Sequence, residues 1–128
     1  LAASYLESTI LHAMESNGRN PNQISAAVYL APNAIDYSGY PDCRPEFLSA
    51  MNVVAQTCHT FPISVEAPFL NLTKAEIIKI GLELGVDYAK TWTCYEGQDV
   101  ACGKCGSCNE RLEAFEINNF IDPLSYNI

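Results

Sequence analysis

The chain has 128 residues, of which 48% are hydrophobic and 17% are charged, a composition that fits one ordinary globular domain or a large piece of one. Seven Lys and Arg residues against fifteen Asp and Glu residues give a formal net charge of -8, so the overall field disfavours binding to a nucleic-acid backbone. No window approaches the about 20 apolar residues of a membrane-spanning helix, and no export signal is recognisable. The sequence therefore predicts a soluble, cytoplasmic protein.

The first predicted elements are a helix and a strand. Apolar residues recur at helical spacing over residues 1–17, and Gly18 then offers the left-handed backbone that ends many helices. The pattern is already under way at Leu1, which favours a chain that starts inside a larger protein. A nearly continuous apolar run at residues 24–31 (ISAAVYLA) predicts a strand buried on both faces, as in a parallel sheet.

A loop, a helix and a second strand follow. Residues 32–44 (PNAIDYSGYPDCR) are rich in turn formers and predict a loop. Pro45 suits the first turn of a helix, and apolar residues at helical spacing continue it to about Thr57. Residues 61–67 (FPISVEA) predict the second strand. We therefore expect a strand-helix-strand crossover with a parallel pair of strands, which places the chain in the α/β class.

Two further helices are predicted after the second strand. Thr73 and Glu76 have the spacing of a capping box, which begins a helix that Gly85 should end. Residues 109–120 (NERLEAFEINNF) predict the last helix. Its expected buried side consists of Leu112, Phe115 and Ile117. Because two strands are too few for a parallel sheet, further strands are either hidden in the predicted loops or lie in residues outside this chain.

The most specific local pattern is C-x7-C-x2-C-x2-C. Four thiolates within fifteen residues can surround one ion, and the x2 spacing lets a tight turn direct both flanking sulfurs inward. Gly103 and Gly106 each follow a cysteine, where the lack of a Cβ lets backbone N–H groups point at sulfur. Lys104 and Arg111 are expected to offset the charge of the thiolates. The predicted metal ligands are Cys94, Cys102, Cys105 and Cys108.

Three chemistries are compatible with these cysteines. Two disulfides need an oxidising compartment, which the lack of an export signal disfavours. An iron–sulfur cluster also uses C-x2-C-x2-C, although the Cys-Pro that follows in ferredoxins is missing. Zinc fits the spacing best, and four sulfur ligands leave no position for water, so Zn²⁺ would be structural. Cys58 stands apart from the four and is predicted to be a small buried residue.

A chemically rich loop follows the predicted first strand. Residues 36–44 (DYSGYPDCR) contain two aspartates, two tyrosines and one arginine. In open α/β sheets ligands bind beyond the carboxyl ends of the strands, which makes this loop a candidate binding site. A purely structural interpretation is also open, in which Asp42 caps the next helix, the tyrosines pack on the sheet and Arg44 is solvated.

Three strings in this order resemble the 7-cyano-7-deazaguanine synthase family: DYSGYPDCRPEF at residues 36–47, TWTCY at residues 91–95 and CGKCGSC at residues 102–108. The resemblance runs over nearly the whole chain. It implies a Rossmann-like domain of the PP-loop ATPase superfamily and a ligase of queuosine biosynthesis, a tRNA modification pathway. Such a ligase converts 7-carboxy-7-deazaguanine and ammonia to the 7-cyano product with ATP and Mg²⁺. The resemblance also implies one Zn²⁺ on the four cysteines and, for many members, a homodimer.

By this resemblance the polar loop holds the deazaguanine, and residue chemistry suggests the individual roles. Asp36 or Asp42 would accept hydrogen bonds from the amidine-like edge, Tyr37 or Tyr40 would stack on the ring, and Arg44 would lie near the carboxylate or a phosphate. The candidate substrate-binding or catalytic residues are Asp36, Tyr37, Ser38, Gly39, Tyr40, Asp42 and Arg44, with Thr93 and Tyr95 as further candidates.

The family's phosphate-binding SGGxDS loop has no match in this sequence. Residues 1–90 are therefore expected to be the C-terminal part of the PP-loop ATPase-like domain, and residues 91–128 its zinc-binding segment. The N-terminal half would lie elsewhere, so residues 1–128 alone are predicted neither to bind ATP tightly nor to catalyse. Direct contact with nucleic acid or a membrane is not expected.

Two other functions stay open on the sequence. The chain could be a non-catalytic zinc module that docks on a partner, or a PP-loop enzyme with a different substrate, such as a sulfur-inserting enzyme. A docking module has no need of acids, tyrosines and an arginine beyond a strand. Sulfur transfer needs a reactive thiol outside the metal site, and Cys43 is the candidate in the loop. A packed, unreactive thiol is the favoured interpretation of Cys43.

Overall fold

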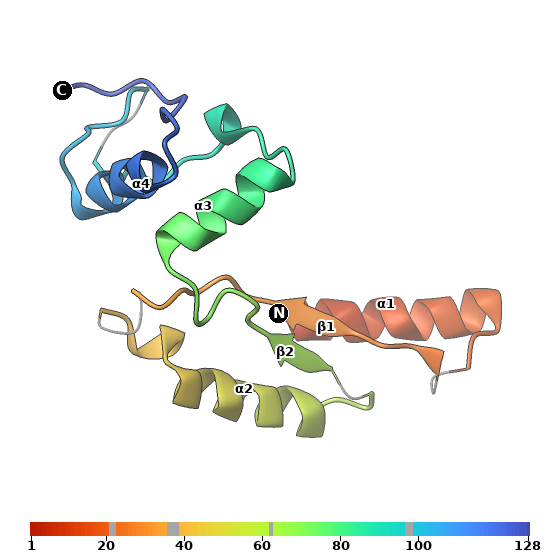
Figure 1. Cartoon of the computed structure of the whole chain (residues 1–128). Coiled ribbons are helices and arrows are strands. Elements are labelled where there is room, and N and C mark those ends of the chain that lie inside the picture. Colours follow the sequence, from red (N-terminus) through yellow and green to blue (C-terminus); the bar gives the residue numbers. More distant parts are fainter. Residues whose placement is uncertain (21–22, 36–38, 62, 97–98) are drawn as a thin grey trace. The chain divides into compact units, whose positions relative to one another are not determined.

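The computed structural model describes residues 1–20, 23–35, 39–61, 63–96 and 99–128. Contacts divide the chain into two compact units, Leu1–Asn71 and Leu72–Ile128. Within the described ranges, no helix combines the length and the apolar character needed to cross a membrane. The elements, in chain order (Figure 1), are α1 (Ala2–Asn17), β1 (Ala27–Tyr29), the short 3-10 helix η3 (Pro41–Cys43), α2 (Pro45–Thr57), β2 (Ser64–Glu66), α3 (Lys74–Glu83), the 3-10 helix η4 (Tyr88–Lys90) and α4 (Gly106–Ile117).

The first unit contains the predicted α/β crossover. Strands β1 and β2 pair in parallel, with Val28 opposite Val65, and α2 connects them (Figure 1). The pairing extends beyond the strands, since the N–H of Ser64 donates to the carbonyl oxygen of Ala26 at 3.0 Å. The strand-helix-strand order and the parallel pair are therefore confirmed, and the fold class is α/β.

Both strands are shorter, and β1 is more exposed, than the sequence predicts. The predicted ranges 24–31 and 61–67 reduce to three residues each. The prediction that the first strand is buried on both faces is wrong, because Ala27 and Val28 are half-buried and Tyr29 is 70% exposed. In the described part of the chain the sheet has two strands. Each strand therefore has a single neighbour, and part of each face stays uncovered.

A side chain closes one edge of this sheet. Backbone groups of successive strand residues point to alternate edges. Since Ser64 N–H points to β1, the N–H of Val65 points to the opposite edge of β2, where it donates to Asn52 Oδ1 of α2 at 2.8 Å. Helix α2 thus satisfies the outer edge of β2 at this position. Among the described residues, the outer edge of β1 is the one that has neither a strand nor such a cap.

The helices of the first unit agree with prediction. Helix α1 is followed by Gly18, whose φ of 60° is left-handed, and α2 spans the predicted range from Pro45. Cys58 is exposed, so its prediction as a buried residue is wrong. The buried face of α2 carries Leu48 and Ala55, and Cys58 is already the C-cap, where the chain leaves the helix.

The second unit begins with the predicted capping box. Glu76 N–H donates to Thr73 Oγ1 at 3.3 Å, and Thr73 N–H donates to Glu76 Oε2 at 2.7 Å. After the helix, Gly85 has a left-handed φ of 72°, as expected at the end of α3. Tyr88 and Phe115 pack edge to face with their ring centres 5.2 Å apart. The buried residues of this core are Ile78, Ala114 and Phe115.

Helix α4 begins earlier and buries a different face than predicted. It starts at Gly106 because Cys105 adopts the extended N-cap conformation, so the helix begins inside the cysteine cluster. Of the three residues expected on the buried side, Phe115 is buried and Leu112 is half-buried, but Ile117 is 61% exposed, so that assignment is wrong. The buried residues of α4 are Cys108, Arg111, Ala114 and Phe115.

Gly81 of α3 leaves room for the Tyr88 side chain. A Cβ at this position would overlap the Tyr88 hydroxyl, which donates to the carbonyl oxygen of Ile78 at 3.2 Å. We expect Gly81→Ala to displace the Tyr88 ring and to destabilise the second unit by about 2 kcal/mol, because overpacking outweighs the about 1 kcal/mol of helix propensity that alanine adds. Trp92 is the single tryptophan and lies in this unit, so urea unfolding followed by its fluorescence measures the change.

Gly106→Ala is the matched control, since a Cβ at Gly106 meets nothing within 4 Å. Its free energy of unfolding should equal the wild-type value or exceed it by up to about 1 kcal/mol, because alanine adds helix propensity at the first residue of α4. Equal stability of the Gly81→Ala variant and the wild-type chain would contradict the described packing of Tyr88.

The predicted division into residues 1–90 and 91–128 concerns the part that each segment plays in a larger enzyme, and it stays a prediction. The contacts within the chain place the boundary between the two units at Asn71 and Leu72. This boundary lies before α3 because α3 buries Ile78 against α4 in the second unit.

Candidate metal centre and substrate loop

The four cysteines predicted as metal ligands lie together in the second unit. Their sulfur atoms are all within 4.8 Å of one another. Cys94 follows η4 in a segment without regular secondary structure, Cys102 comes directly after an isolated bridge at Ala101, and Cys105 and Cys108 belong to the N-cap and first turn of α4. Segments that are separate in the sequence thus bring four sulfurs to one point.

Backbone N–H groups point at these sulfurs, as the glycine spacing predicts. Gly103 has a left-handed φ of 70°, which turns the chain back toward Cys102. The N–H groups of Cys105 and Lys104 donate to Cys102 Sγ at 3.3 and 3.5 Å, and Cys102 N–H donates to Cys94 Sγ at 3.3 Å. Such N–H donors around the sulfurs are the outer-shell contacts that orient the ligands of a metal site.

The sulfur spacing fits a single ion. Cys102 Sγ and Cys108 Sγ are 3.9 Å apart, close to the about 3.8 Å that tetrahedral geometry with Zn–S bonds of about 2.3 Å requires. A disulfide would bring two sulfurs to about 2 Å. An iron–sulfur cluster binds its cysteines to different iron atoms and therefore needs a wider set of sulfurs. Among the three predicted chemistries, the donor set fits Zn²⁺ best.

The two sulfurs of α4 differ in their ease of deprotonation. Burial raises the pKa of the Cys108 thiol to about 12, so a metal ion has to displace its proton at neutral pH. The backbone N–H groups of Tyr95 and Cys108 lower the pKa of the Cys105 thiol. Cys105 also lies at the N-terminus of α4, where the helix dipole favours negative charge.

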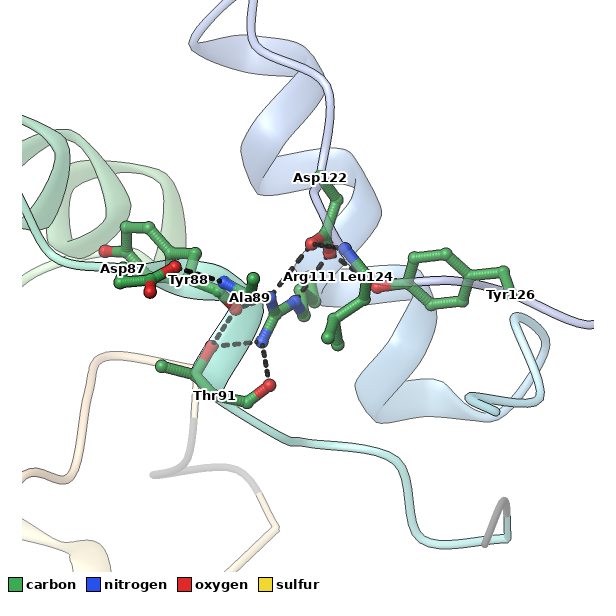
Figure 2. A network of polar contacts seen from close by, with 8 residues as sticks. All are labelled: Asp87, Tyr88, Ala89, Thr91, Arg111, Asp122, Leu124 and Tyr126. Atoms are coloured by element: carbon green, nitrogen blue, oxygen red, sulfur yellow. Dashed lines mark hydrogen bonds and ion pairs between the residues drawn. The ribbon is translucent and has the colours of Figure 1, made fainter. Parts of the chain in front are cut away.

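Arg111 lies one turn after Cys108, and its guanidinium group donates to oxygen atoms of Asp122, Thr91 and Tyr88 (Figure 2). Nε and Nη2 donate to the two carboxylate oxygens of Asp122 at 2.5 and 2.9 Å. Nη1 donates to Thr91 Oγ1 at 2.7 Å, and Nη2 also donates to the carbonyl oxygen of Tyr88 at 3.0 Å. The prediction that Arg111 offsets the charge of the thiolates is therefore wrong, because its guanidinium pairs with the buried carboxylate of Asp122. The side chain of Lys104 is exposed.

Asp122 collects further donors from the C-terminal segment. The Tyr126 hydroxyl donates to Asp122 Oδ2 at 2.5 Å, and Leu124 N–H donates to Oδ1 at 3.0 Å. Burial raises the pKa of the Asp122 carboxyl, but the hydrogen bonds from Arg111 and Tyr126 outweigh it and hold that pKa below its ordinary value. Arg111 is 3% exposed and Asp122 is 8% exposed, so both charges are buried and paired.

The described part of the polar loop lies beyond the carboxyl end of β1, as predicted. Asp36, Tyr37 and Ser38 lie outside the described residues. The described candidates, all exposed, are Gly39, Tyr40, Asp42 and Arg44. Asp42 lies in η3 and forms no cap of α2, whose N-cap is Arg44 without a side-chain bond. The structural role considered for Asp42 is therefore wrong, and the loop presents polar groups to the solvent.

Hydrogen bonds within the second unit hold two residues of the segment TWTCY in place. Trp92 Nε1 donates to the carbonyl oxygen of Cys94 at 3.0 Å, and Thr91 receives the hydrogen bond from Arg111. Thr93 is half-buried, and Tyr95 is largely exposed. Trp92 therefore orients the backbone of a predicted ligand, whereas Tyr95 leaves most of its ring in solvent.

Sequence reasoning missed Asp122 and Tyr126. The available signal was the position of Arg111, which falls at helical spacing between Cys108 and Phe115. An arginine on a buried helix face needs a carboxylate partner. Asp122 is the buried acid that meets this need, and no pattern around it distinguishes it from solvated acids.

The comparisons with known proteins match the resemblance noted in the sequence. The family model described as "QueC: Queuosine biosynthesis protein QueC" matches residues 17–119. The 7-cyano-7-deazaguanine synthase of Marinobacter nauticus is 50% identical over 102 residues, which are 80% of this chain and 46% of that protein. The synthase of Hahella chejuensis is 52% identical over 100 residues, 78% of this chain and 43% of that protein. The synthase of Pseudoalteromonas translucida is 48% identical over 102 residues, 80% of this chain and 47% of that protein.

The matched range contains both candidate sites. Residues 17–119 include the polar loop at 36–44 and the four clustered cysteines, whose sulfurs lie within 4.8 Å of one another. The chain spans about half the length of the curated relatives it matches. Since the family model covers most of the chain, the chain belongs to the QueC family of queuosine biosynthesis proteins.

Proposed function

We propose that this chain is the metal-binding and substrate-recognition part of an ATP-dependent ligase that converts 7-carboxy-7-deazaguanine and ammonia to 7-cyano-7-deazaguanine. The observation that carries the proposal is the match to the QueC family, whose relatives are named 7-cyano-7-deazaguanine synthase. These names favour this activity over a docking module and over a different substrate. Because the chain spans about half of those relatives, the complete activity needs the remainder of their length.

The reaction defines what the protein has to supply. A carboxylate reacts poorly with ammonia because its oxygen is a poor leaving group, so ATP first converts it to an adenylate. Ammonia then displaces AMP and gives the amide, and a second activation lets the amide oxygen leave as the nitrile forms. The protein contributes mainly by positioning the substrates and by offsetting phosphate charge. The SGGxDS loop for ATP and Mg²⁺ has no counterpart in this sequence, so it belongs to the remainder.

The polar loop is the proposed deazaguanine site. Its described residues are exposed and lie beyond the carboxyl end of a parallel strand, which is where α/β proteins bind ligands. Tyr40 offers a ring for stacking, Asp42 an acceptor for ring N–H groups, and Arg44 a planar cation for a carboxylate or phosphate. Asp36 and Tyr37 are proposed for the same recognition on their chemistry alone.

The four cysteines are proposed to hold one structural Zn²⁺. Four sulfur donors complete a tetrahedral ion and leave no position for substrate or water. The ion would therefore stabilise the second unit and would take no part in the chemical steps. Cys94, Cys102, Cys105 and Cys108 are the ligands in this proposal, and their mutual distances fit the ion.

Uncovered apolar residues support a larger α/β layer. Tyr29 of β1 and Val53 and Val54 of α2 are exposed in the first unit. Parallel sheets are normally covered on both faces and contain more than two strands. We propose that the remainder of the protein adds strands and helices to this unit.

A fusion tests the proposed function. The chain is joined to the remainder of the Marinobacter nauticus synthase and incubated with 7-carboxy-7-deazaguanine, ammonia and ATP, and the nitrile is detected by mass spectrometry. We expect nitrile formation from the fusion and no ATP hydrolysis from the 128-residue chain alone. Arg44→Ala should lower kcat/KM by about 100-fold, since it removes a charge-assisted contact to the substrate.

Arg19→Ala is the control for the Arg44 substitution, because Arg19 is an exposed arginine in the turn after α1. Its kcat/KM should stay within about twofold of that of the unsubstituted fusion. A folded, metal-loaded fusion that forms no nitrile would contradict the proposed function. Near-normal turnover of the Arg44→Ala fusion would overturn only the role of the loop.

A further inference from the structure

Arg111 is the centre of a network of polar contacts with Tyr88, Thr91 and Asp122 (Figure 2), and this network reaches the segments that carry the cysteine ligands. Its own helix carries Cys105 as the N-cap and Cys108 one turn earlier. Its Nη1 donates to the hydroxyl of Thr91 at 2.7 Å and to the carbonyl oxygen of Thr91 at 3.4 Å, three residues before Cys94. One guanidinium group therefore connects α4 to the segment that supplies the first ligand.

The same network reaches the residue before Cys102 through the C-terminal segment. Arg111 pairs with Asp122, and Asp122 accepts the hydrogen bond of the Tyr126 hydroxyl. The backbone around Tyr126 then bridges to Ala101, since Ala101 N–H donates to the carbonyl oxygen of Ser125 at 3.2 Å. Asn127 N–H completes the bridge by donating to the carbonyl oxygen of Ala101 at 2.8 Å. Tyr126 also packs against the cluster formed by Cys94, Ala101 and Cys108.

We propose that Arg111, Asp122 and Tyr126 are positioning residues of the metal centre, which hold the three ligand-bearing segments in the arrangement that a tetrahedral ion requires. None of the three is a predicted ligand. A site whose ligands are held in place before the ion arrives loses less conformational freedom on binding, so its affinity is higher. Outer-shell groups of this kind typically change metal affinity by about 10- to 100-fold when they are removed.

The proposal differs from a general role in stability. A purely structural network would leave the zinc affinity unchanged as long as the folded state stays dominant, even when its loss lowers the free energy of unfolding. Tyr88 provides the comparison, because its hydroxyl also donates one hydrogen bond in the same unit, to the carbonyl oxygen of Ile78 at 3.2 Å. That bond joins η4 to α3 and does not involve Asp122 or the bridge at Ala101. Arg111 contacts the carbonyl oxygen and the ring of Tyr88, and Tyr88→Phe keeps both.

The test compares Tyr126→Phe with Tyr88→Phe in the full 128-residue chain. Zinc affinity is measured by competition with a chromophoric chelator, and the ligand set is checked by the Co²⁺ absorption spectrum at saturation. We expect Tyr126→Phe to weaken zinc binding roughly tenfold while the tetrathiolate Co²⁺ spectrum is kept. Tyr88→Phe should leave the zinc affinity within about twofold of the wild-type value, even if it lowers the free energy of unfolding as much as Tyr126→Phe does.

A second variant keeps the test independent of the Tyr126 side chain. Asn127→Pro removes the N–H that donates to Ala101 and leaves the Arg111–Asp122 pair in place, and we expect it to weaken zinc binding in the same direction. Wild-type affinity in both variants, or an equal loss in the Tyr88→Phe variant, would overturn the proposal. The inference rests on the proposed zinc site, and a wild-type chain that binds no zinc would overturn both together.

Discussion

Replacing Asp122 by alanine is expected to destabilise the second unit by about 4 kcal/mol, because the substitution leaves a buried guanidinium without its carboxylate. Arg111 keeps its contacts to Thr91 and to the carbonyl oxygen of Tyr88, but these are neutral acceptors. Tyr126 loses its acceptor as well. Urea unfolding followed by Trp92 fluorescence measures the loss.

Two further variants separate the buried pair from ordinary surface charge. Lys90→Met removes an exposed ion pair with Asp87 in the same unit and should cost less than about 1 kcal/mol. The double variant Arg111→Met with Asp122→Leu should be more stable than Asp122→Ala, since it removes both charges at once. A loss below about 1 kcal/mol for Asp122→Ala would contradict the burial and pairing described for it.

The same pair gives the unit a defined sensitivity to acid. The pKa of Asp122 in the folded chain lies below the about 3.9 of an unfolded aspartate. Its contribution to stability is therefore fully present above that unfolded value and is lost as the pH falls through the lowered folded pKa. The difference in unfolding free energy between the wild-type chain and Asp122→Ala should be constant near neutral pH and should narrow below about pH 4.

Cys108→Ser is expected to abolish tight metal binding and to destabilise the second unit by about 3 kcal/mol or more, the stabilisation that metal at about 100 times its Kd provides. Cys108 is buried at the start of α4 and lies next to Cys102 Sγ in the cluster. A chelator added to the wild-type chain should produce the same change in Trp92 fluorescence, since Trp92 donates to the backbone of Cys94.

Cys58→Ser is the matched control for this loss. Cys58 is exposed, lies in the first unit and is outside the four-cysteine cluster. Its substitution should leave metal content and Trp92 fluorescence unchanged. Wild-type metal affinity in the Cys108→Ser variant would contradict the assignment of Cys108 as a ligand.

Local spacing explains why much of this structure was predictable. The capping box at Thr73 and Glu76 depends on two residues of one turn, and the four cysteines lie within fifteen residues, so both patterns act at short range. The parallel crossover follows from the order of the apolar runs and from a chirality and connection rule that holds for most α/β proteins. In each case the sequence near the feature contains the physical cause.

The features that escaped prediction depend on distant partners. The burial of β1 depends on how many strands flank it, and this number cannot be read from the residues of the strand itself. In the described part of the chain β1 has one neighbouring strand, and Tyr29 is exposed. The apolar residues of α4 predict one buried face, but the structure buries a different face with Arg111 at its centre. A buried guanidinium needs a carboxylate partner, and this partner is Asp122, eleven residues later in the chain. Ile117 is left in solvent because the helix is oriented by that ion pair and by Cys108.

The most direct measurement of the central claim is zinc K-edge X-ray absorption on the purified chain, combined with metal analysis of the same sample. The account predicts one zinc per chain with four sulfur neighbours at about 2.3 Å and no nitrogen or oxygen neighbour. Bound iron, a mixed shell with oxygen ligands, or a purified chain whose cysteine thiols are oxidised in pairs without metal would contradict it.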